Sequence, residues 1–147
     1  MKENELMVGD WVYGCTDPYS PDEEQKKFPV KVIRIDLDGD IYTMGQNPSD
    51  DPYDDEWWNI EPIPITPEIL EKNFEKREVR ILVGTKTHYC LGNDYFDLAV
   101  SEYTDSIWEV EYTNCEAHFP LIRNLVGYVH ELQHALRLCG ITREITI

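Results

Sequence analysis

The sequence predicts an α+β protein: a small SH3-like N-terminal β-barrel followed by an antiparallel sheet packed with two helices. Three observations lead to this prediction. Short β-rich runs separated by turn residues fill residues 6–61. A proline-rich segment, residues 62–67, then separates this half from the rest. Beyond it, further alternating runs precede one strongly periodic stretch, residues 121–139. We therefore expect two subdomains, residues 1–61 and 62–147, that share one core.

The N-terminal barrel is expected to contain four short strands. Residues 6–14 give a turn and then a strand, and residues 29–35 give a second strand with alternating apolar side chains. The pair Asp38-Gly39 predicts a two-residue hairpin that leads into a third strand, residues 41–44. Residues 57–61 form the fourth strand, with one tryptophan inside and its neighbour outside, because strand side chains alternate.

The second half is expected to begin with a helix over residues 67–74. Thr66 supplies a side-chain oxygen for the helix N-terminus, and Pro67 fits the first helical position. The apolar face of this helix consists of Ile69, Leu70 and Phe74.

A four-stranded meander is expected next, because residues 78–113 alternate and contain turn signals such as Gly92-Asn93. The expected strands are residues 78–83, 88–91, 95–100 and 107–112. In the last of these, apolar side chains alternate with Glu109 and Glu111, so one face is acidic. Residues 141–147 also alternate and predict a short edge strand.

Residues 121–139 predict an amphipathic helix that packs on this sheet. Its apolar residues recur at spacings of three and four, which places them on one stripe. Pro120 fits the first helical position and Gly140 a C-terminal stop. The stripe consists of Leu121, Leu125, Val129, Leu132, Leu136 and Cys139.

The same stretch contains His130-Glu131-Leu132-Gln133-His134, a match to the HExxH zinc-protease pattern. Two histidines at i and i+4 bind zinc on one helix face, and the glutamate serves as general base, but a third protein ligand is required. Arg137 and Gly140 stand where the long form of the motif has glycine and histidine. We expect the match to be incidental, with both histidines on the polar face, away from the core.

A third zinc ligand is hard to find elsewhere in the chain. Downstream of the motif, Glu144 is the sole carboxylate. Upstream, the candidate cluster is Cys115-Glu116-Ala117-His118. A zinc-dependent hydrolase that uses the match at residues 130–134 therefore stays as an alternative function, and no catalytic or metal-binding residue is assigned.

Three stretches together resemble a family of small proteins carried by prophages and mobile elements of gut anaerobes. They are Glu-Leu-Met-Val-Gly-Asp-Trp-Val at residues 5–12, Ile-Glu-Pro-Ile-Pro-Ile-Thr-Pro-Glu-Ile-Leu-Glu-Lys-Asn-Phe at residues 60–74, and Tyr-Val-His-Glu-Leu-Gln at residues 128–133. The resemblance implies an accessory protein of a mobile element and no assigned activity. The family's closing pattern reads Tyr-Val-His-x-Leu-Gln-Asn, so His134 stands at an asparagine position. After Leu138 this chain departs from the family's Leu-Thr-Gly-Glu-Glu-Leu.

The charge of the chain restricts its partners. The 147 residues carry a formal net charge of −16, and the first sixty contain fifteen acidic and five basic residues. Such a field repels phosphate backbones, so we expect no direct contact with nucleic acid. The acidic loop, residues 45–56, together with Tyr53 and Trp57-Trp58, is a candidate contact surface for a basic protein.

The chain is expected to be cytoplasmic and to make no contact with a membrane. No signal-peptide pattern or run of about 20 apolar residues is present. The four cysteines, Cys15, Cys90, Cys115 and Cys139, form no CxxC pair, so we expect reduced thiols, with Cys90 and Cys139 in the core.

Two further ligand hypotheses come from composition. Asp36, Asp38 and Asp40 match the first positions of a calcium loop, but Ile41 and Asn47 replace its required Gly and Glu, so we expect no calcium site. A small-ligand binding module that uses aromatic residues of the barrel is a second alternative function. Those residues are Trp11, Tyr13, Trp57 and Trp58.

The sequence therefore predicts an acidic accessory protein that acts by protein–protein contact, in its sharper form an inhibitor of a basic nucleic-acid-binding or defence factor. No cofactor is expected. The identity of the partner and the oligomeric state do not follow from the residues.

Overall fold

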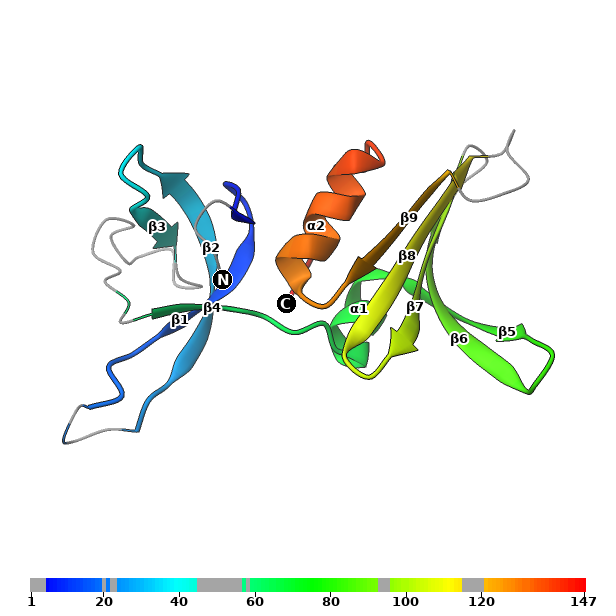
Figure 1. Ribbon diagram of the computed structural model, residues 1–147, viewed down its shortest axis with the longest axis horizontal. Helices are drawn as coiled ribbons and strands as arrows, with labels where there is room; N and C mark the ends of the chain where they lie inside the picture. Colours follow the sequence, from blue (N-terminus) through cyan, green and yellow to red (C-terminus); the bar gives the residue numbers. More distant parts are fainter. Residues whose placement is uncertain are drawn as a thin grey trace. The chain divides into compact units, whose positions relative to one another are not determined.

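The computed structural model has an α+β fold with two antiparallel sheets and two helices, which confirms the α+β part of the predicted fold class (Figure 1). It describes residues 5–19, 21, 24–44, 57, 59–92, 96–114 and 121–147. The chain divides into two compact units, Met1–Ile63 and Pro64–Ile147. This division falls two residues after the predicted boundary, and a core shared by the two stays a prediction.

The first unit contains one four-stranded antiparallel sheet in the order β3-β2-β1-β4. The chain runs through three consecutive strands, and the fourth returns to pair with the first. Within the described residues the sheet is open, since no pairing closes it into the predicted barrel. The strands are β1 (Trp11–Cys15), β2 (Lys27–Ile35), β3 (Ile41–Met44) and β4 (Asn59–Pro62).

The core of the first unit lies on one face of this sheet. Val12, Val30 and Val32 are at most 1% exposed, which confirms the predicted alternation along the second strand. Leu6 completes this buried cluster, and four partly buried side chains pack against it: Ile35, Ile41, Trp57 and Ile60. Burial of branched side chains on one sheet face is therefore what fixes the register of the sheet.

The turn between β2 and β3 has three residues and not the predicted two. Asp36 N donates to Asp40 O at 2.9 Å, and Gly39 N donates to Asp36 O at 3.0 Å. Gly39 has φ 88°, in the left-handed region that glycine adopts without strain. A tight turn followed by a left-handed glycine is a common three-residue hairpin, so the Asp-Gly pair signalled the hairpin correctly but not its length.

Trp57 packs directly over the backbone of Gly14 in β1. A Cβ atom added to Gly14 would collide with the indole ring, so only glycine permits this approach. The indole Nε1 donates to Thr43 Oγ1 at 2.8 Å, and Phe28 lies 6.0 Å from the ring. Trp57 is thus the inward tryptophan of the predicted pair, while Trp58 lies outside the described residues.

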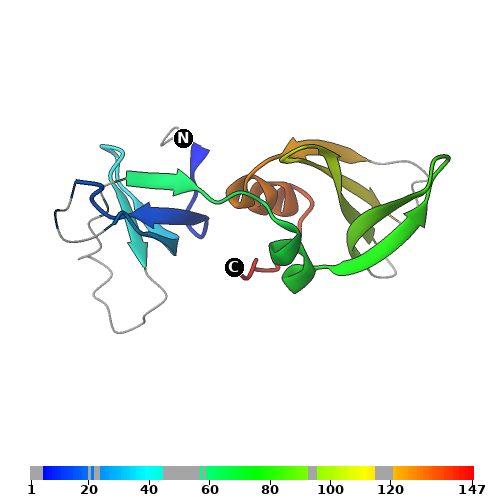
Figure 2. The ribbon, with the colours of Figure 1, turned by 90° about the horizontal axis from the view of Figure 1, so that it is seen from below.

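The second unit contains a five-stranded antiparallel sheet in the order β5-β6-β7-β8-β9. In Figure 2 the two helices lie near one another beside this curved sheet. The elements are α1 (Pro67–Asn73), β5 (Glu75–Arg80), β6 (Thr85–Gly92), β7 (Phe96–Thr104), β8 (Ile107–Asn114), β9 (Ile122–Val126) and α2 (Val129–Leu138).

Helix α1 begins as the sequence predicts. Thr66 Oγ1 accepts a hydrogen bond from Ile69 N at 3.4 Å, and Pro67 occupies the start of the helix. The predicted apolar face is buried, since Leu70 is fully buried and Ile69 and Phe74 are at most 9% exposed. The capping threonine, the proline and the apolar spacing all predict a helix at the same residues, so the sequence locates this short helix correctly.

The predicted helix over residues 121–139 is wrong in its first eight residues, because α2 begins only at Val129. Ile122–Val126 forms strand β9, paired with β8 from Tyr112↔Ile122 to Trp108↔Val126. Leu125 is 54% exposed, so it belongs to no buried helical stripe. The apolar spacing continues through this segment by coincidence. Cross-strand pairing and the β-branched residues at both ends of the segment determine the strand instead.

Strand β5 also differs from the prediction, because it ends at Arg80 and the following apolar residues lie in a turn. Gly84 has φ 87°, and Ile81 N donates to Gly84 O at 3.0 Å, which closes the turn. The apolar run Ile81-Leu82-Val83 reads as strand by composition, but the glycine after it reverses the chain.

The predicted edge strand over residues 141–147 is also wrong. These residues form no regular element, although Ile141 and Ile145 are buried. The segment is held instead by Asn73, which is 3% exposed. Asn73 Nδ2 donates to Thr146 O at 2.8 Å and to Ile69 O at 2.7 Å, and its Oδ1 accepts from Thr146 N at 2.7 Å. One buried amide therefore satisfies backbone groups that a neighbouring strand would otherwise pair.

We predict that Asn73→Ala lowers the free energy of unfolding by about 2–3 kcal/mol, because it leaves buried backbone groups of Thr146 and Ile69 without their partner. Urea denaturation followed by circular dichroism measures this loss. Lys72→Ala, an exposed change in the same helix, is the control and should shift stability by less than about 0.5 kcal/mol. Equal effects of the two substitutions would contradict the role given to Asn73.

We predict that Gly14→Ala destabilises the first unit by about 1–3 kcal/mol, because the new methyl group must displace the Trp57 ring from the core. The change should also alter tryptophan fluorescence, since the indole loses its packing and its bond to Thr43. A thermal melt followed by fluorescence measures both effects. Gly84→Asn serves as the control, because space is open around Gly84 and asparagine tolerates positive φ.

Candidate functional site

The N-terminus of α2 is organised by the glutamate of the HExxH match. Glu131 Oε2 accepts hydrogen bonds from Gly127 N at 2.7 Å and from Tyr128 N at 3.1 Å. Glutamate at this position of a helix commonly reaches back to backbone N–H groups of the cap, and its negative charge suits the positive end of the helix. The carboxylate that a zinc protease would use as general base therefore holds the start of the helix.

The two histidines of the match differ in exposure. His130 is 3% exposed, whereas His134 is partly exposed, so the prediction that both point away from the packed side is wrong for His130. The rings of Tyr128 and His130 stack at 6.0 Å, and those of His130 and His134 meet edge to face at 5.9 Å. The prediction assumed that only the apolar stripe of the helix is buried. In the structure α2 also buries polar side chains outside this stripe, among them His130 and Gln133.

A third metal ligand is not among the residues brought together here. Across the described ranges, no group of three or more histidine, cysteine, aspartate or glutamate side chains is arranged to hold a metal ion. The candidate upstream cluster, residues 115–118, lies outside the described residues. The hydrogen bonds of Glu131 to backbone N–H groups are those of a helix N-terminus.

The aspartate-rich turn has structural partners as well. Arg34 Nε lies 2.6 Å from Asp36 Oδ1. The charge of Asp36 is the main cause that raises the pKa of Tyr42 above its usual value. Asp36 thus interacts with Arg34 and Tyr42 on the neighbouring strands. Asn47, which matches the last calcium-loop position, lies outside the described residues.

The aromatic residues proposed as a small-ligand site lie on opposite faces of β1. Trp11 and Tyr13 alternate with Val12 and Gly14 along the strand, so they point to the other face. Trp57 covers Gly14 on the core face, while Lys31 Nζ lies 5.8 Å from the Trp11 ring centre. The described aromatic side chains therefore do not converge on one pocket.

The three described cysteines carry no disulfide. Cys15 and Cys90 are buried, which confirms the prediction for Cys90, and Cys139 is partly buried. Burial is the main cause that raises the pKa of each of these thiols. A raised thiol pKa disfavours the reactive thiolate, so these cysteines have the properties of packing residues.

The acidic character of the first unit is concentrated on its exposed side chains. The basic side chains are largely engaged: Lys27 forms an ion pair with Glu61, Arg34 with Asp36, and Lys31 lies over Trp11. Exposed carboxylates are Glu5, Asp17, Glu24, Asp38 and Asp40. The surface of this unit therefore presents acidic groups, while most of its described cations have local partners.

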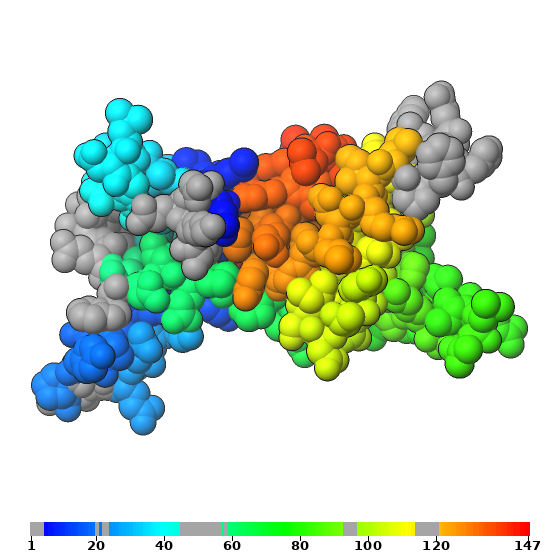
Figure 3. Space-filling model, viewed as in Figure 1, coloured from blue at the N-terminus to red at the C-terminus, as the bar shows by residue number. Residues whose placement is uncertain are grey.

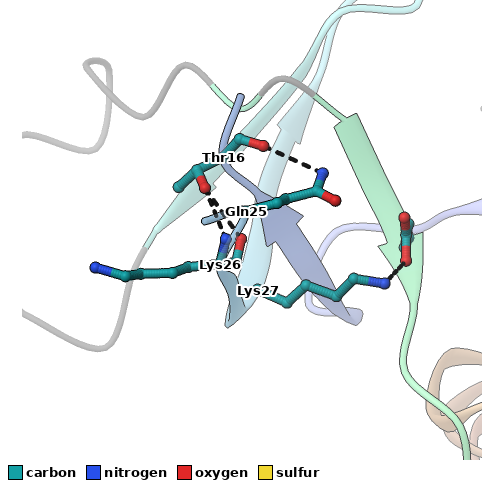
Figure 4. A network of polar contacts seen from close by, with 5 residues as sticks. Thr16, Gln25, Lys26 and Lys27 are labelled. Carbon is teal, nitrogen blue, oxygen red and sulfur yellow. Dashed lines mark hydrogen bonds and ion pairs between the residues drawn. The ribbon is translucent and has the colours of Figure 1, made fainter. Parts of the chain in front are cut away.

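A polar network fixes the base of the loop that joins β1 and β2 (Figure 4). Thr16 Oγ1 accepts from Lys26 N at 2.8 Å, and Gln25 Nε2 donates to Thr16 O at 3.2 Å. Next to it, the Lys27–Glu61 ion pair joins β2 to β4 across β1. The loop that carries Asp17 and Glu24 is thus held at its base by hydrogen bonds, and β2 is joined to β4 by an ion pair.

One surface feature of the second unit escaped the sequence analysis. The turn after β5 exposes Ile81, Leu82 and Val83. Two signals point to it: the glycine that follows the apolar run, and the absence of acidic residues from residues 79–92 of an otherwise acidic chain.

No protein-family model, curated protein or solved structure matches the chain. Within the part of the chain that the structure describes, no helix has the length and apolar character needed to cross a membrane.

We predict that the purified, untagged chain contains no stoichiometric zinc, because zinc needs a third protein ligand and none accompanies His130 and His134 among the described residues. Elemental analysis measures the metal content. Glu131→Ala should lower the free energy of unfolding by about 1–2 kcal/mol, as expected for loss of a helix cap. His134→Ala should leave zinc content unchanged, and stoichiometric zinc that this variant loses would contradict the structural role of the motif.

Proposed function

We propose that this protein is a non-catalytic, acidic accessory protein that acts by contact with a basic protein partner. In the sharper form, the partner is a nucleic-acid-binding or defence factor whose phosphate-binding surface the acidic unit occupies. The observation that carries the proposal is the charge of the first unit, in which exposed carboxylates outnumber cations that are mostly engaged locally.

Electrostatics explains why this surface favours a basic partner. Residues 1–63 contain sixteen acidic and five basic residues, whereas residues 64–147 contain thirteen and eight. Clustered charge of one sign steers oppositely charged proteins and suppresses association with like-charged ones. An acidic protein on a phosphate-binding surface competes with nucleic acid through the same counterion-dependent forces.

The strand order of the first unit supports an SH3-like architecture as part of this proposal. In such barrels three consecutive strands form a meander and the last strand returns beside the first, and β3-β2-β1-β4 has this arrangement. We also retain the resemblance to proteins of prophages and mobile elements as part of the proposal. Small acidic proteins that occupy a basic factor would suit an element that resides in a host cell.

The two alternative functions have less support from the contacts. A zinc hydrolase would need Glu131 next to a metal-bound water, but its carboxylate binds Gly127 and Tyr128. A small-ligand module would need convergent aromatic side chains, but Trp57 and Trp11 lie on opposite faces of β1. Contact through the charged surface requires neither arrangement.

We predict that the chain displaces a fluorescent DNA duplex from at least one member of a panel of basic DNA-binding proteins, and that displacement weakens steeply as salt rises. Fluorescence anisotropy at several salt concentrations measures it. The triple variant Glu24→Gln/Asp38→Asn/Asp40→Asn should bind about tenfold more weakly at low salt, because it removes three exposed negative charges from the first unit.

The matched control is Asp97→Asn/Glu102→Gln/Asp105→Asn, which removes the same charge from exposed positions of the second unit. This control should retain most of the displacement. An absence of displacement across the panel, or equal losses for the two triple variants, would contradict the proposal.

A further inference from the structure

We infer that the tip of the β5–β6 hairpin, residues 79–86, is a contact site that enters the surface of an anionic lipid bilayer. This site lies in the second unit and goes beyond the proposed contact of the acidic first unit with a basic protein. Four observations carry the inference: the hairpin projects from its sheet, its tip is apolar, its local charge is positive, and its cations lie on both faces.

The hairpin extends past the sheet that supports it. β5 pairs with β6 from Glu75↔Cys90 to Arg80↔Thr85, whereas β6 pairs with β7 only from His88 to Gly92. Residues 78–87 therefore form a two-stranded ribbon without a third strand. Figure 3 shows this green segment projecting from the surface of its unit. A ribbon of this kind is positioned to reach a target that the body of the unit does not touch.

The end of the ribbon is apolar and exposed. Leu82 is 106% exposed and Val83 88%, and Ile81 and Val79 are 47% and 37% exposed. These side chains add little to the core, and turn tips are ordinarily built from polar residues and glycine. A contiguous exposed apolar group of this kind commonly marks an interaction site.

The charge at the tip is opposite in sign to that of the chain. Residues 79–92 contain Arg80 and Lys86 and no acidic residue, in a chain of net charge −16. Within the described residues, neither cation forms an ion pair, whereas Lys76 and Arg77, further from the tip, pair with Glu71 and Glu75. The two cations next to the apolar tip are thus available for an anionic surface.

The two cations lie on opposite faces of the ribbon. Arg80 pairs with Thr85, and Val79 pairs with Lys86. Cross-strand partners share a face and successive residues alternate, so Arg80 and Lys86 flank the tip on both sides. A partner with a flat or grooved surface would meet one face, whereas a lipid interface surrounds an inserted tip. There the apolar side chains enter the acyl boundary and the cations meet lipid phosphates.

The acidity of the whole chain does not prevent this contact. At physiological ionic strength the screening length is about 8 Å, so charges close to the tip dominate the field at the lipid surface. Glu78, the acidic residue closest in sequence to the tip, accepts a hydrogen bond from Thr87 Oγ1 at 2.8 Å. The expectation that the chain makes no membrane contact rested on the absence of a spanning run, and a tip at the interface needs none.

The test is flotation of the full chain with vesicles of phosphatidylcholine and phosphatidylserine, compared with vesicles of phosphatidylcholine alone. We expect binding to the anionic vesicles that decreases with salt. Leu82→Asp should lower the bound fraction about tenfold, because it puts a charge into the apolar boundary. Arg80→Gln/Lys86→Gln should lower binding to anionic vesicles by about tenfold as well.

The structure offers a matched control in the turn between β2 and β3 of the first unit. Leu37 is 107% exposed, but it lies between Asp36 and Asp38. Leu37→Asp should therefore leave vesicle binding unchanged. Since Leu37 and Leu82 are both fully exposed, Leu37→Asp and Leu82→Asp should keep the melting curve of the natural chain. Leu82→Ser provides a second variant at the tip.

Three results would overturn the inference. The first is an absence of flotation with anionic vesicles, which would include the case in which the tip binds only a protein. The second is an equal loss of binding in the Leu37 and Leu82 variants. The third is equal binding to neutral vesicles, unaffected by salt or by removal of the two cations. None of these results bears on the displacement of DNA by the acidic unit.

Discussion

The second unit depends on the corner formed by Gly127 and Tyr128, where a strand ends and a helix begins. Glu131 accepts hydrogen bonds from both backbone N–H groups. On the other side of the corner, Ile65 N donates to Gly127 O at 3.1 Å, and Pro64 forms an isolated bridge with Tyr128. The segment before α1, the end of β9 and the start of α2 therefore meet at one point. Loss of this contact would loosen the entry to both helices.

A second contact joins the end of α1 to the segment that follows α2. The Asn73 amide, at the end of α1, binds the backbone of Thr146 in the C-terminal segment, residues 141–147. Isoleucines 141 and 145 are buried alongside. Glu131 thus satisfies backbone groups at the start of α2, whereas Asn73 joins the end of α1 to the C-terminal segment.

The elements that could be predicted from sequence are those in which several local signals agree. Helix α1 has a capping threonine, a proline and a buried face, and β8 alternates strictly. The C-terminal half failed where one signal stood alone. Apolar spacing continued from α2 into β9, and only the pairing with β8 and the position of Glu131 show where the helix starts. Residues 141–147 alternate like a strand, but their partner is a side chain in another element, which no local pattern reveals.

The candidate site shows the same division between local and distant information. The missing third ligand already disfavours zinc binding in the sequence, whereas the role of Glu131 follows only from its hydrogen bonds to Gly127 and Tyr128. His130 was misplaced because a helical wheel contains no information about neighbouring elements. Composition places Ile81-Leu82-Val83 in a strand and so hides the projecting hairpin, and only the register shows that the pairing of β6 with β7 does not extend past His88.

Two of the hairpin turns, β2–β3 in the first unit and β5–β6 in the second, differ in the charge around an exposed apolar tip. Each presents a fully exposed leucine, Leu37 among aspartates and Leu82 between cations. Exposure of a leucine side chain to water costs little free energy when the charged groups around it stay solvated. Burial of that leucine against a partner is favourable only where the partner carries charge opposite to that of the surrounding groups. The two turns carry similar apolar tips but opposite charges, so they favour partners of opposite charge. The acidic unit and the cationic hairpin therefore need not compete for one partner.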